Sequence, residues 1–280
     1  MSGPFAGAEA RVGPVARALD PVAGALGPVA ASLPWVAIPA ALLVGLSLGL
    51  LGSGGSILAV PLLRTVMGLS FAVAKATSFP VVGLAAAAAL SIHLRRGTVR
   101  VREAAPFALA SVPAAFLASR ELAPRVPELA QSLLFAALML VAAWRMARGA
   151  PAEDGRARRR STLLVATVGA VAGLFTGLLG VGGGFLIVPA LVLTLGFDVR
   201  SAVATSLLVI VLNCAAGLAA DLLGPKTPIR WDLAAVFSAA GVAGALVGHR
   251  LGSRFSPTVL RRTFAAVVLL AAVALLVKSF

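Results

Sequence analysis

Long apolar stretches, separated by short polar or basic segments, make up most of the chain. A membrane-spanning helix needs roughly 20 mostly apolar residues, and hydropathy marks eight such blocks, four in each half. They cover residues 34–51 running on to 56–69, 71–94, 104–119, 128–147, 161–179 running on to 181–196, 201–223, 231–249 and 259–279. The pattern predicts an all-α polytopic membrane protein with about eight hydrophobic segments.

The first block of each half is too long for a single straight crossing. As one helix, residues 34–69 would be about 54 Å long, whereas the hydrocarbon core of a bilayer is about 30 Å thick. Each of these blocks contains a glycine-rich sequence, at 52–55 and at 180–184, and a proline follows it. Glycine permits backbone turns that other residues resist, and proline disturbs a helix interior. We therefore predict a broken helix in each half, with Pro61 and Pro189 as part of the break.

The two halves of the chain repeat each other. Residues 45–78 align without a gap on residues 173–206, at an offset of 128, with 17 identities in 34 pairs. The identities fall on glycines, a proline and a Thr-Ser pair, so they indicate a true internal repeat and not a shared apolar composition. The predicted organisation is a flexible N-terminal tail at 1–33, a first transmembrane repeat at 34–147, a basic cytoplasmic linker at 148–160 and a second transmembrane repeat at 161–280.

Two membrane topologies fit this repeat. If each broken block crosses once, the chain has eight crossings and the repeats run parallel. If each broken block is a re-entrant hairpin, each half crosses three times and the repeats are inverted. Lysine and arginine mark cytoplasmic loops, and the inverted topology gathers the basic clusters at 95–102, 145–160 and 250–262 on one side. The charges therefore favour inversion by a small margin.

The composition agrees with a membrane protein. The chain is 60% hydrophobic and 12% charged, with a mean hydropathy of +1.01, whereas a soluble domain holds about 25% charged residues. We expect a multi-pass integral protein of the cell (inner) membrane. The net charge of +14 comes from clusters between apolar blocks, which is typical of loops that face lipid headgroups. Nucleic acid is therefore not an expected partner, and the lipid bilayer is.

The chain lacks the residue patterns of an enzyme. Its single cysteine and two histidines have no metal-ligand spacing, and no Gly-Lys-Ser or Gly-Lys-Thr follows either glycine cluster. The carboxylates lie in the predicted tail and loops, without a nucleophile and base beside them. We expect no enzymatic activity, no metal and no cofactor. Primary active transport would need a partner chain that binds ATP.

The two breaks are candidate anion sites. Irregular backbone deep in a membrane is tolerated only where protein or a water-filled cavity surrounds it. A half-helix that begins there presents free amides and a partial positive charge to an anion, and paired broken helices hold the substrate in duplicated transporters. The alternative is that the glycines serve close helix packing. The candidate positions are Gly52, Gly54, Gly55, Ser56, Gly180, Gly182, Gly183 and Gly184, of which 54–56 and 182–184 are expected to head the second half-helices.

Polar side chains within the apolar segments are further candidates. Thr77, Ser78, Thr205 and Ser206 recur as Thr-Ser pairs in both copies, and their hydroxyls can donate to an oxyanion or bond to carbonyls of their own helix. Asn213, deep in its segment, is expected to line the pathway.

Two ionisable groups, Lys75 and Asp221, lie within apolar blocks. Lys75 is matched by Val203 in the second copy. We expect its long side chain to reach the membrane interface, the alternative being a positive charge in one half of the site. Asp221 lies near the end of its segment and is also expected at the interface. Without an expected buried carboxylate, the coupling ion stays open between H⁺ and Na⁺.

At its glycine-rich breaks the chain resembles the sulfite exporter TauE/SafE family of membrane permeases. The hallmark of that family is a duplicated glycine-rich break followed by a Val-Pro pair. Here it reads GLLGSGGSILAVPLL at 49–63 and GLLGVGGGFLIVPALV at 177–192, and Ala-Thr-Ser follows each copy. The first copy departs in having Ser56 where the second has Gly184. The resemblance covers about residues 36–279 and implies transport of sulfur-containing anions such as sulfite, sulfonates or sulfoacetate.

The expected function is therefore secondary transport of a small anion by alternating access, around a central site built from two broken helices. An anion channel is one alternative, which would show a conductance far above carrier turnover. A non-transport membrane scaffold is another, in which the glycines would serve packing only.

Overall fold

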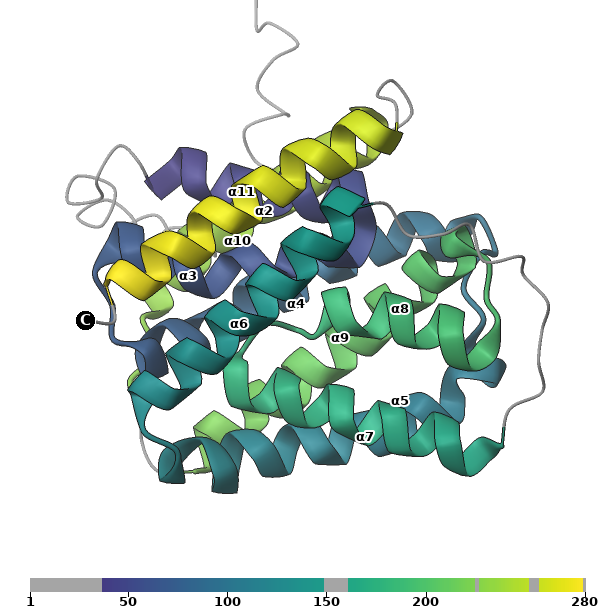
Figure 1. The fold of residues 1–280 in the computed structure, drawn as a ribbon, viewed down its shortest axis with the longest axis horizontal. Helices are drawn as coiled ribbons and strands as arrows, with labels where there is room; N and C mark the ends of the chain where they lie inside the picture. The colour runs from purple at the N-terminus through teal and green to yellow at the C-terminus, as the bar shows by residue number, and fades with distance from the viewer. Residues whose placement is uncertain (1–36, 149–160, 225–226, 252–256, 279–280) are drawn as a thin grey trace, which may run out of the picture.

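The structure is a computed structural model that describes residues 37–148, 161–224, 227–251 and 257–278. The predicted tail at 1–33 and all but the first residue of the predicted linker at 148–160 lie outside these residues. Every secondary-structure element in the described part is helical, which confirms the predicted all-α fold (Figure 1).

The elements of the first half follow the predicted apolar blocks closely. In chain order they are α2 (Ala37–Leu51), the 3₁₀ helix η1 (Gly52–Leu58), α3 (Ala59–Met67), α4 (Phe71–Arg95), α5 (Val101–Leu117), the π-helical turn η2 (Ala118–Leu122), the 3₁₀ turn η3 (Ala123–Arg125) and α6 (Glu128–Arg148). The second half contains α7 (Thr162–Leu179), α8 (Gly184–Leu195), α9 (Val199–Leu223), α10 (Trp231–Leu251) and α11 (Pro257–Val277). We call α2–α6 the first repeat and α7–α11 the second.

Five helical stretches among the described residues are long and apolar enough to cross a membrane. They are Phe71–Arg95, Val101–Arg125, Thr162–Leu179, Val199–Leu223 and Trp231–Leu251. The apolar helices on both sides of the first break and α8 after the second break are shorter, as are α6 and α11 in their apolar parts. The chain is thus a polytopic helical protein whose first helix in each repeat is divided.

The equivalent helices α4 and α9 pack against each other in opposite directions. Lys75, near the start of α4, contacts Asp221, near the end of α9. Further along, a Cβ atom on Gly83 of α4 would lie 3.2 Å from Cβ of Cys214 in α9. Two copies of one element that pack antiparallel are related by a twofold axis perpendicular to them. This arrangement favours inverted repeats over parallel ones.

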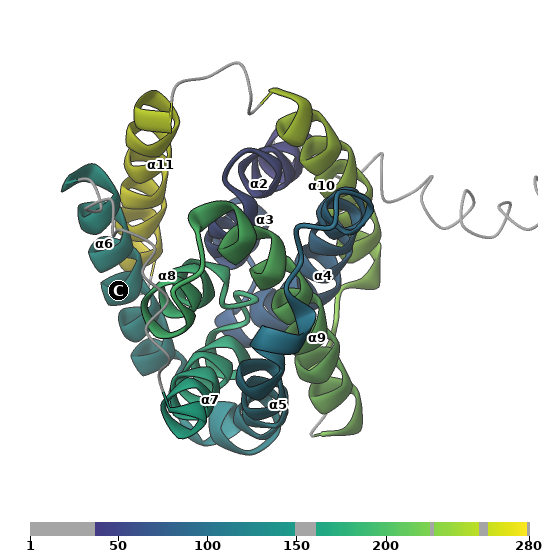
Figure 2. The ribbon, with the colours of Figure 1, turned by 90° about the vertical axis from the view of Figure 1, so that its right-hand side faces the viewer.

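The two repeats also exchange packing partners. Helix α2 packs along α10, and its equivalent α7 packs along α5, and these two pairs lie at opposite sides of the bundle (Figure 2). Glycines permit the close approach. A Cβ on Gly45 would lie 2.7 Å from the carbonyl carbon of Gly241, and one on Gly173 would lie 2.8 Å from that of Ser111. Small residues bring membrane helices together in this way, and the reciprocal contacts lock one repeat into the other.

Helices α6 and α11 pack on each other along one edge of the bundle (Figures 1 and 2).

The break in the second repeat is a tight turn made by glycines. Gly180, Gly182 and Gly183 have φ angles of +74°, +66° and +72°, which only glycine adopts readily. The turn brings Gly183 back against the Thr176 side chain of α7, and α8 then packs beside α7. Gly183 caps α8, and Gly184 is its first residue, as predicted. Pro189 lies inside α8, five residues beyond its first residue, Gly184.

The break in the first repeat has a different form. Residues Gly52–Leu58 continue as a 3₁₀ helix that joins α3 directly, so 54–56 do not head α3 as expected. The N-cap of α3 is Leu58, and Pro61 lies in its first turn. The Ser47 hydroxyl, for which the second copy has phenylalanine, lies 3.4 Å from the Gly55 carbonyl oxygen. The shorter bond of that hydroxyl goes to the Val44 carbonyl of its own helix at 2.8 Å, and Gly55 itself packs closely on α2, since a Cβ there would lie 2.5 Å from Ser47 Oγ.

Candidate functional site

The predicted site residues lie inside the bundle. The structure buries Gly55, Ser56, Thr77, Ser78, Gly180, Gly182, Gly183, Gly184, Thr205, Ser206 and Asn213. Gly52 and Gly54 lie in the backbone of η1. The first break also contacts the helix that follows the second one, because η1 packs against α8. The expectation that both breaks meet at one central site stays a prediction.

Helix α4 holds the second break in place. The Ser78 hydroxyl lies 2.5 Å from the Gly180 carbonyl oxygen and 2.6 Å from that of Lys75. A Cβ on Gly180 would lie 2.9 Å from Cα of Lys75. One on Gly182 would lie 2.9 Å from a methyl carbon of Val82 and 3.0 Å from one of Ile210. In this conformation the glycines of the turn thus serve close packing, the alternative that the sequence left open.

Thr77 and Thr205 make reciprocal bonds between the repeats. The Arg230 amide donates to Thr77 Oγ1 at 3.2 Å, and the Arg100 amide donates to Thr205 Oγ1 at 3.0 Å. Each threonine thereby anchors the segment that precedes a long helix of the other repeat. Ser206 donates to the Val203 carbonyl of its own helix at 2.7 Å, the second of the two roles considered for these hydroxyls.

Asn213 is paired with a side chain of the other repeat. Its Nδ2 lies 2.8 Å from Ser111 Oγ, and its Oδ1 lies 3.1 Å from the same oxygen. Both residues are fully buried. Asn213 therefore links α9 to α5 in this conformation, and its expected place on the substrate pathway stays a prediction.

The expectation that Lys75 and Asp221 reach the membrane interface is wrong. Lys75 is 3% exposed and Asp221 is 7% exposed, and the Lys75 ammonium lies 3.1 Å from Asp221 Oδ1. Ser119 completes a triangle, with its Oγ 2.9 Å from Lys75 Nζ and 2.7 Å from Asp221 Oδ1. The three side chains come from α4, α9 and η2. They meet because the antiparallel packing brings the start of α4 to the end of α9.

The pair is incompletely satisfied. Asp221 Oδ2 is buried and has no hydrogen-bond partner among the described residues. A buried carboxylate is costly unless its charge is paired and its oxygens are hydrogen-bonded. Here the charge is paired, but one oxygen is left without a donor. Such an oxygen calls for a functional explanation.

Two adjoining cavities lie beside this cluster. One, of about 180 Å³, is lined by Ala72, Lys75, Ser119, Arg120, Ala123, Pro124, Gln131, Ala220, Asp221 and Thr227. The other, of about 320 Å³, is lined by Arg120, Glu121, Pro124, Arg125, Leu223 and Gly224. They share Arg120 and Pro124. We call the smaller one, which contains the buried ion pair, the lysine cavity.

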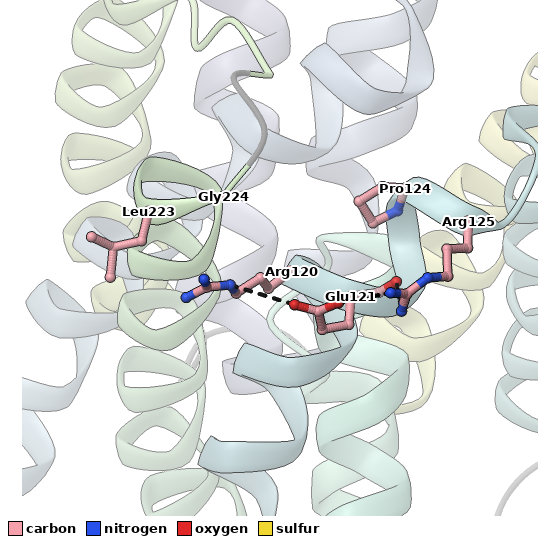
Figure 3. Close-up of a pocket in the computed structure, with 6 residues that line it drawn as sticks. All are labelled: Arg120, Glu121, Pro124, Arg125, Leu223 and Gly224. Carbon is pink, nitrogen blue, oxygen red and sulfur yellow. Dashed lines mark hydrogen bonds and ion pairs between the residues drawn. The ribbon is translucent and has the colours of Figure 1, made fainter.

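The larger cavity has a basic lining (Figure 3). Arg120 and Arg125 lie on either side of Glu121, at 3.5 Å and 3.0 Å from its carboxylate. One acidic group therefore faces two basic ones there. In the lysine cavity Asp221 likewise faces Lys75 and Arg120. Together the linings carry a positive excess, with Lys75, Arg120 and Arg125 against Glu121 and Asp221.

The opposite end of the bundle has different chemistry at the equivalent positions. At the offset of 128, Asp221 corresponds to His93 and Lys75 to Val203. The end of α5 aligns with α10 at an offset of 130, which matches Ser119 with His249. The His93 and His249 rings contact each other edge to face, with centroids 5.3 Å apart. The buried ion pair is therefore a feature of one end only.

The comparisons with known proteins agree with this architecture. A family model described as Sulfite exporter TauE/SafE matches residues 37–275, from α2 to α11. A protein of Xylella fastidiosa (strain 9a5c) named "Probable membrane transporter protein" is 36% identical over 253 residues, which are 88% of this chain and 95% of that protein. A protein of Bacillus subtilis (strain 168) named "Probable membrane transporter protein YjnA" is 27% identical over 258 residues, 84% of this chain and 96% of that protein. No solved structure matches the chain significantly.

Proposed function

This chain belongs to the sulfite exporter TauE/SafE family, and from that premise we propose that it is a secondary transporter of small anions in the cell membrane. The relatives with similar sequences are named as membrane transporters. The polytopic helical fold and the positive excess around the two cavities support the same conclusion.

The observation that carries the proposal is the position of the second break directly behind the lysine cavity. The Lys75 side chain lines the cavity, while its backbone packs against Gly180. The chain continues from that glycine into α8, and α8 contacts η1 of the first break. Lys75 thus lies between the cavity and Gly180 of the second break.

Alternating access suits this arrangement better than an open channel. The turn at Gly182 is packed between Val82 and Ile210, so an anion can pass the breaks only after α4 and α9 move. Repeats related by a perpendicular twofold axis can exchange their conformations, and duplicated transporters open to either side in this way. The packed breaks therefore support a carrier.

The substrate class follows from the family and from the donors at the cavities. Oxyanions bind to ammonium and guanidinium groups through short charge-assisted hydrogen bonds, and Lys75, Arg120 and Arg125 offer such groups. The family name points to sulfite, and we propose sulfonates and sulfoacetate as further anions of the same sulfur-containing class.

Uptake into proteoliposomes that contain the purified full-length chain tests this proposal. Sulfite, sulfate, taurine and sulfoacetate serve as substrates and competitors, and we expect saturable uptake of at least one anion. Gly182→Ala should abolish uptake, because the new methyl group meets Val82 and Ile210 at a positive φ. Gly241→Ala is the matched control, since its Cβ would lie 3.6 Å from the nearest atom, in ordinary contact.

Two outcomes contradict the proposal. If none of the four compounds moves, small sulfur-containing anions are not the substrates. If Gly182→Ala assembles and transports as Gly241→Ala does, the second break has no part in the pathway. Currents far above carrier turnover in planar bilayers would establish the channel alternative instead.

A further inference from the structure

We infer that Asp221 is the proton-binding residue of this transporter and that its protonation releases Lys75 to bind the anion. Transport would then be coupled to H⁺, with proton and anion taken up from the same side. The inference rests on the proposed function, because it assigns the coupling ion and the anion-binding group of that pathway.

The geometry makes Lys75 unavailable to an anion in the observed state. Its ammonium lies 3.1 Å from Asp221 Oδ1 and 2.9 Å from Ser119 Oγ, and the pair as a whole is neutral. Charges are paired in low-dielectric surroundings because an unpaired one is costly there. An anion that arrives in the lysine cavity must therefore compete with a carboxylate already in contact with Lys75.

Protonation of Asp221 removes that competition. A protonated carboxyl group becomes a hydrogen-bond donor at one oxygen and keeps an acceptor at the other. Oδ2 has no partner among the described residues, so it can take the proton while Oδ1 still accepts from Ser119. The cluster then carries a net charge of +1 on Lys75, and an anion in the cavity restores neutrality.

The other acidic groups around this end are already engaged. Glu121 pairs with Arg120 and Arg125. Glu128 at the start of α6 accepts from the amides of Phe71 and Ala72 at 3.3 Å each. Asp232 at the start of α10 pairs with Arg230 at 2.6 Å. Among the described residues, the charged groups at this end of the elements around Asp221 are thus Lys75, Arg120, Glu121, Arg125, Glu128, Arg230 and Asp232. Among these described carboxylates, Asp221 is the one that is buried and also lines the lysine cavity.

The same surroundings disfavour Na⁺ as the coupling ion. A sodium ion needs several oxygen ligands in place of its water, whereas Asp221 Oδ1 is occupied by an ammonium and a hydroxyl. Lys75 and Arg120 would repel a second cation in a cavity of about 180 Å³. A proton needs no coordination shell and leaves no extra charge on the carboxylate.

The test uses the full-length chain in proteoliposomes with a trapped pH-sensitive dye and sulfoacetate outside. Sulfoacetate stays ionised between about pH 6 and pH 8, so protons that enter with it are carried by the protein. In the wild type we expect internal acidification during uptake and a KM that rises about tenfold between these pH values. We expect no acidification without the anion and no anion uptake without proton entry.

Three variants separate the roles. Asp221→Asn imitates the protonated carboxyl group, and we expect uptake without acidification and a KM that changes less than about twofold with pH. Lys75→Met should abolish saturable uptake, and Lys75→Arg should restore part of it. Glu103→Gln removes an exposed carboxylate that pairs with Arg100 at 3.3 Å, and this matched control should behave as the wild type does. Elution of each variant as the wild-type species on gel filtration shows that it has folded.

The outcomes distinguish a failure of the proton coupling through Asp221 from a failure of the proposed anion transport. Uptake of sulfoacetate without acidification, or a pH-dependent KM that survives in Asp221→Asn, overturns the inference and leaves the proposed function in place. If Asp221→Asn does not fold, KM is measured over the same pH range in Ser119→Ala. Loss of the bond from Ser119 to Asp221 Oδ1 should shift the pH dependence of KM. An unshifted profile there overturns the inference. If the wild type moves none of the four compounds, the proposed function falls and the inference falls with it.

Discussion

Removing one member of the buried ion pair should destabilise the protein far more than removing both. In Lys75→Met, Asp221 is left as a buried carboxylate whose remaining neighbour in the cluster is the Ser119 hydroxyl. Loss of one partner of a buried pair costs about 3–5 kcal/mol, whereas well-packed apolar replacements of both are often neutral. We therefore expect Lys75→Met and Asp221→Leu to be strongly destabilised and the double variant to regain most of the loss.

Thermal unfolding in detergent, followed by tryptophan fluorescence, measures this effect. In a chain of this size 1 kcal/mol corresponds to about 2–4 °C in Tm, so each single variant should melt roughly 6–20 °C below the wild type. The double variant should fall within about 4 °C of it. Arg125→Gln, which breaks an exposed pair with Glu121, is the control and should cost no more than about 1 kcal/mol.

A different outcome would refute the burial of the pair as the structure shows it. If Lys75→Met melts within about 2 °C of the wild type, Asp221 is reached by water or by another cation. If the double variant melts as low as the sum of the single losses predicts, the two charges do not interact. In both cases the ion pair could not hold Lys75 away from an anion.

Two further predictions concern the contacts between the repeats. Gly173→Ala should destabilise the protein by about 1–3 kcal/mol, because the new methyl group meets the backbone of Ser111. The control Gly241→Ala should leave Tm nearly unchanged. Equal Tm values for the two variants would contradict the close packing of α5 on α7. Asn213→Ala should lower the free energy of unfolding by about 0.6–1.7 kcal/mol, as for buried polar bonds between membrane helices. The double variant Asn213→Ala/Ser111→Ala should lower it little further. If the losses of the two single variants simply add up in the double variant, the two side chains are not partners.

Hydropathy predicted the helices well because burial in lipid and burial in protein demand the same apolar composition. The block at 71–94 became α4, Phe71–Arg95, and the block at 201–223 became α9, Val199–Leu223. Both breaks fall at the glycines, and in the second one the positive φ angles of Gly180, Gly182 and Gly183 require that residue. Local patterns of this kind depend on the backbone alone, and the sequence displays them directly.

The ion pair could not be predicted in the same way. Lys75 and Asp221 are separated by 146 positions, and they meet only because α4 and α9 run in opposite directions. Hydropathy gives the length of a helix but neither its neighbours nor its rotation about its own axis. Placed near the ends of long apolar segments, both residues look like interface residues. Of the two topologies, only the inverted one places the start of α4 beside the end of α9.

The repeat separates the packing of this protein from its chemistry. Features that hold the helices together occur twice, such as Thr77 with Thr205, each accepting from a backbone amide of the other repeat. The charged residues at the ends of α4 and α9 have no charged equivalent in the other repeat. Asp221 corresponds to His93, and Lys75 corresponds to Val203. An approximate twofold axis makes the two breaks equivalent with respect to the two faces of the membrane. Such symmetry alone cannot give transport a preferred direction. The unmatched groups are therefore where a difference between the two membrane faces can arise, and by our inference the lysine cavity is the end at which a proton changes the charge presented to an anion.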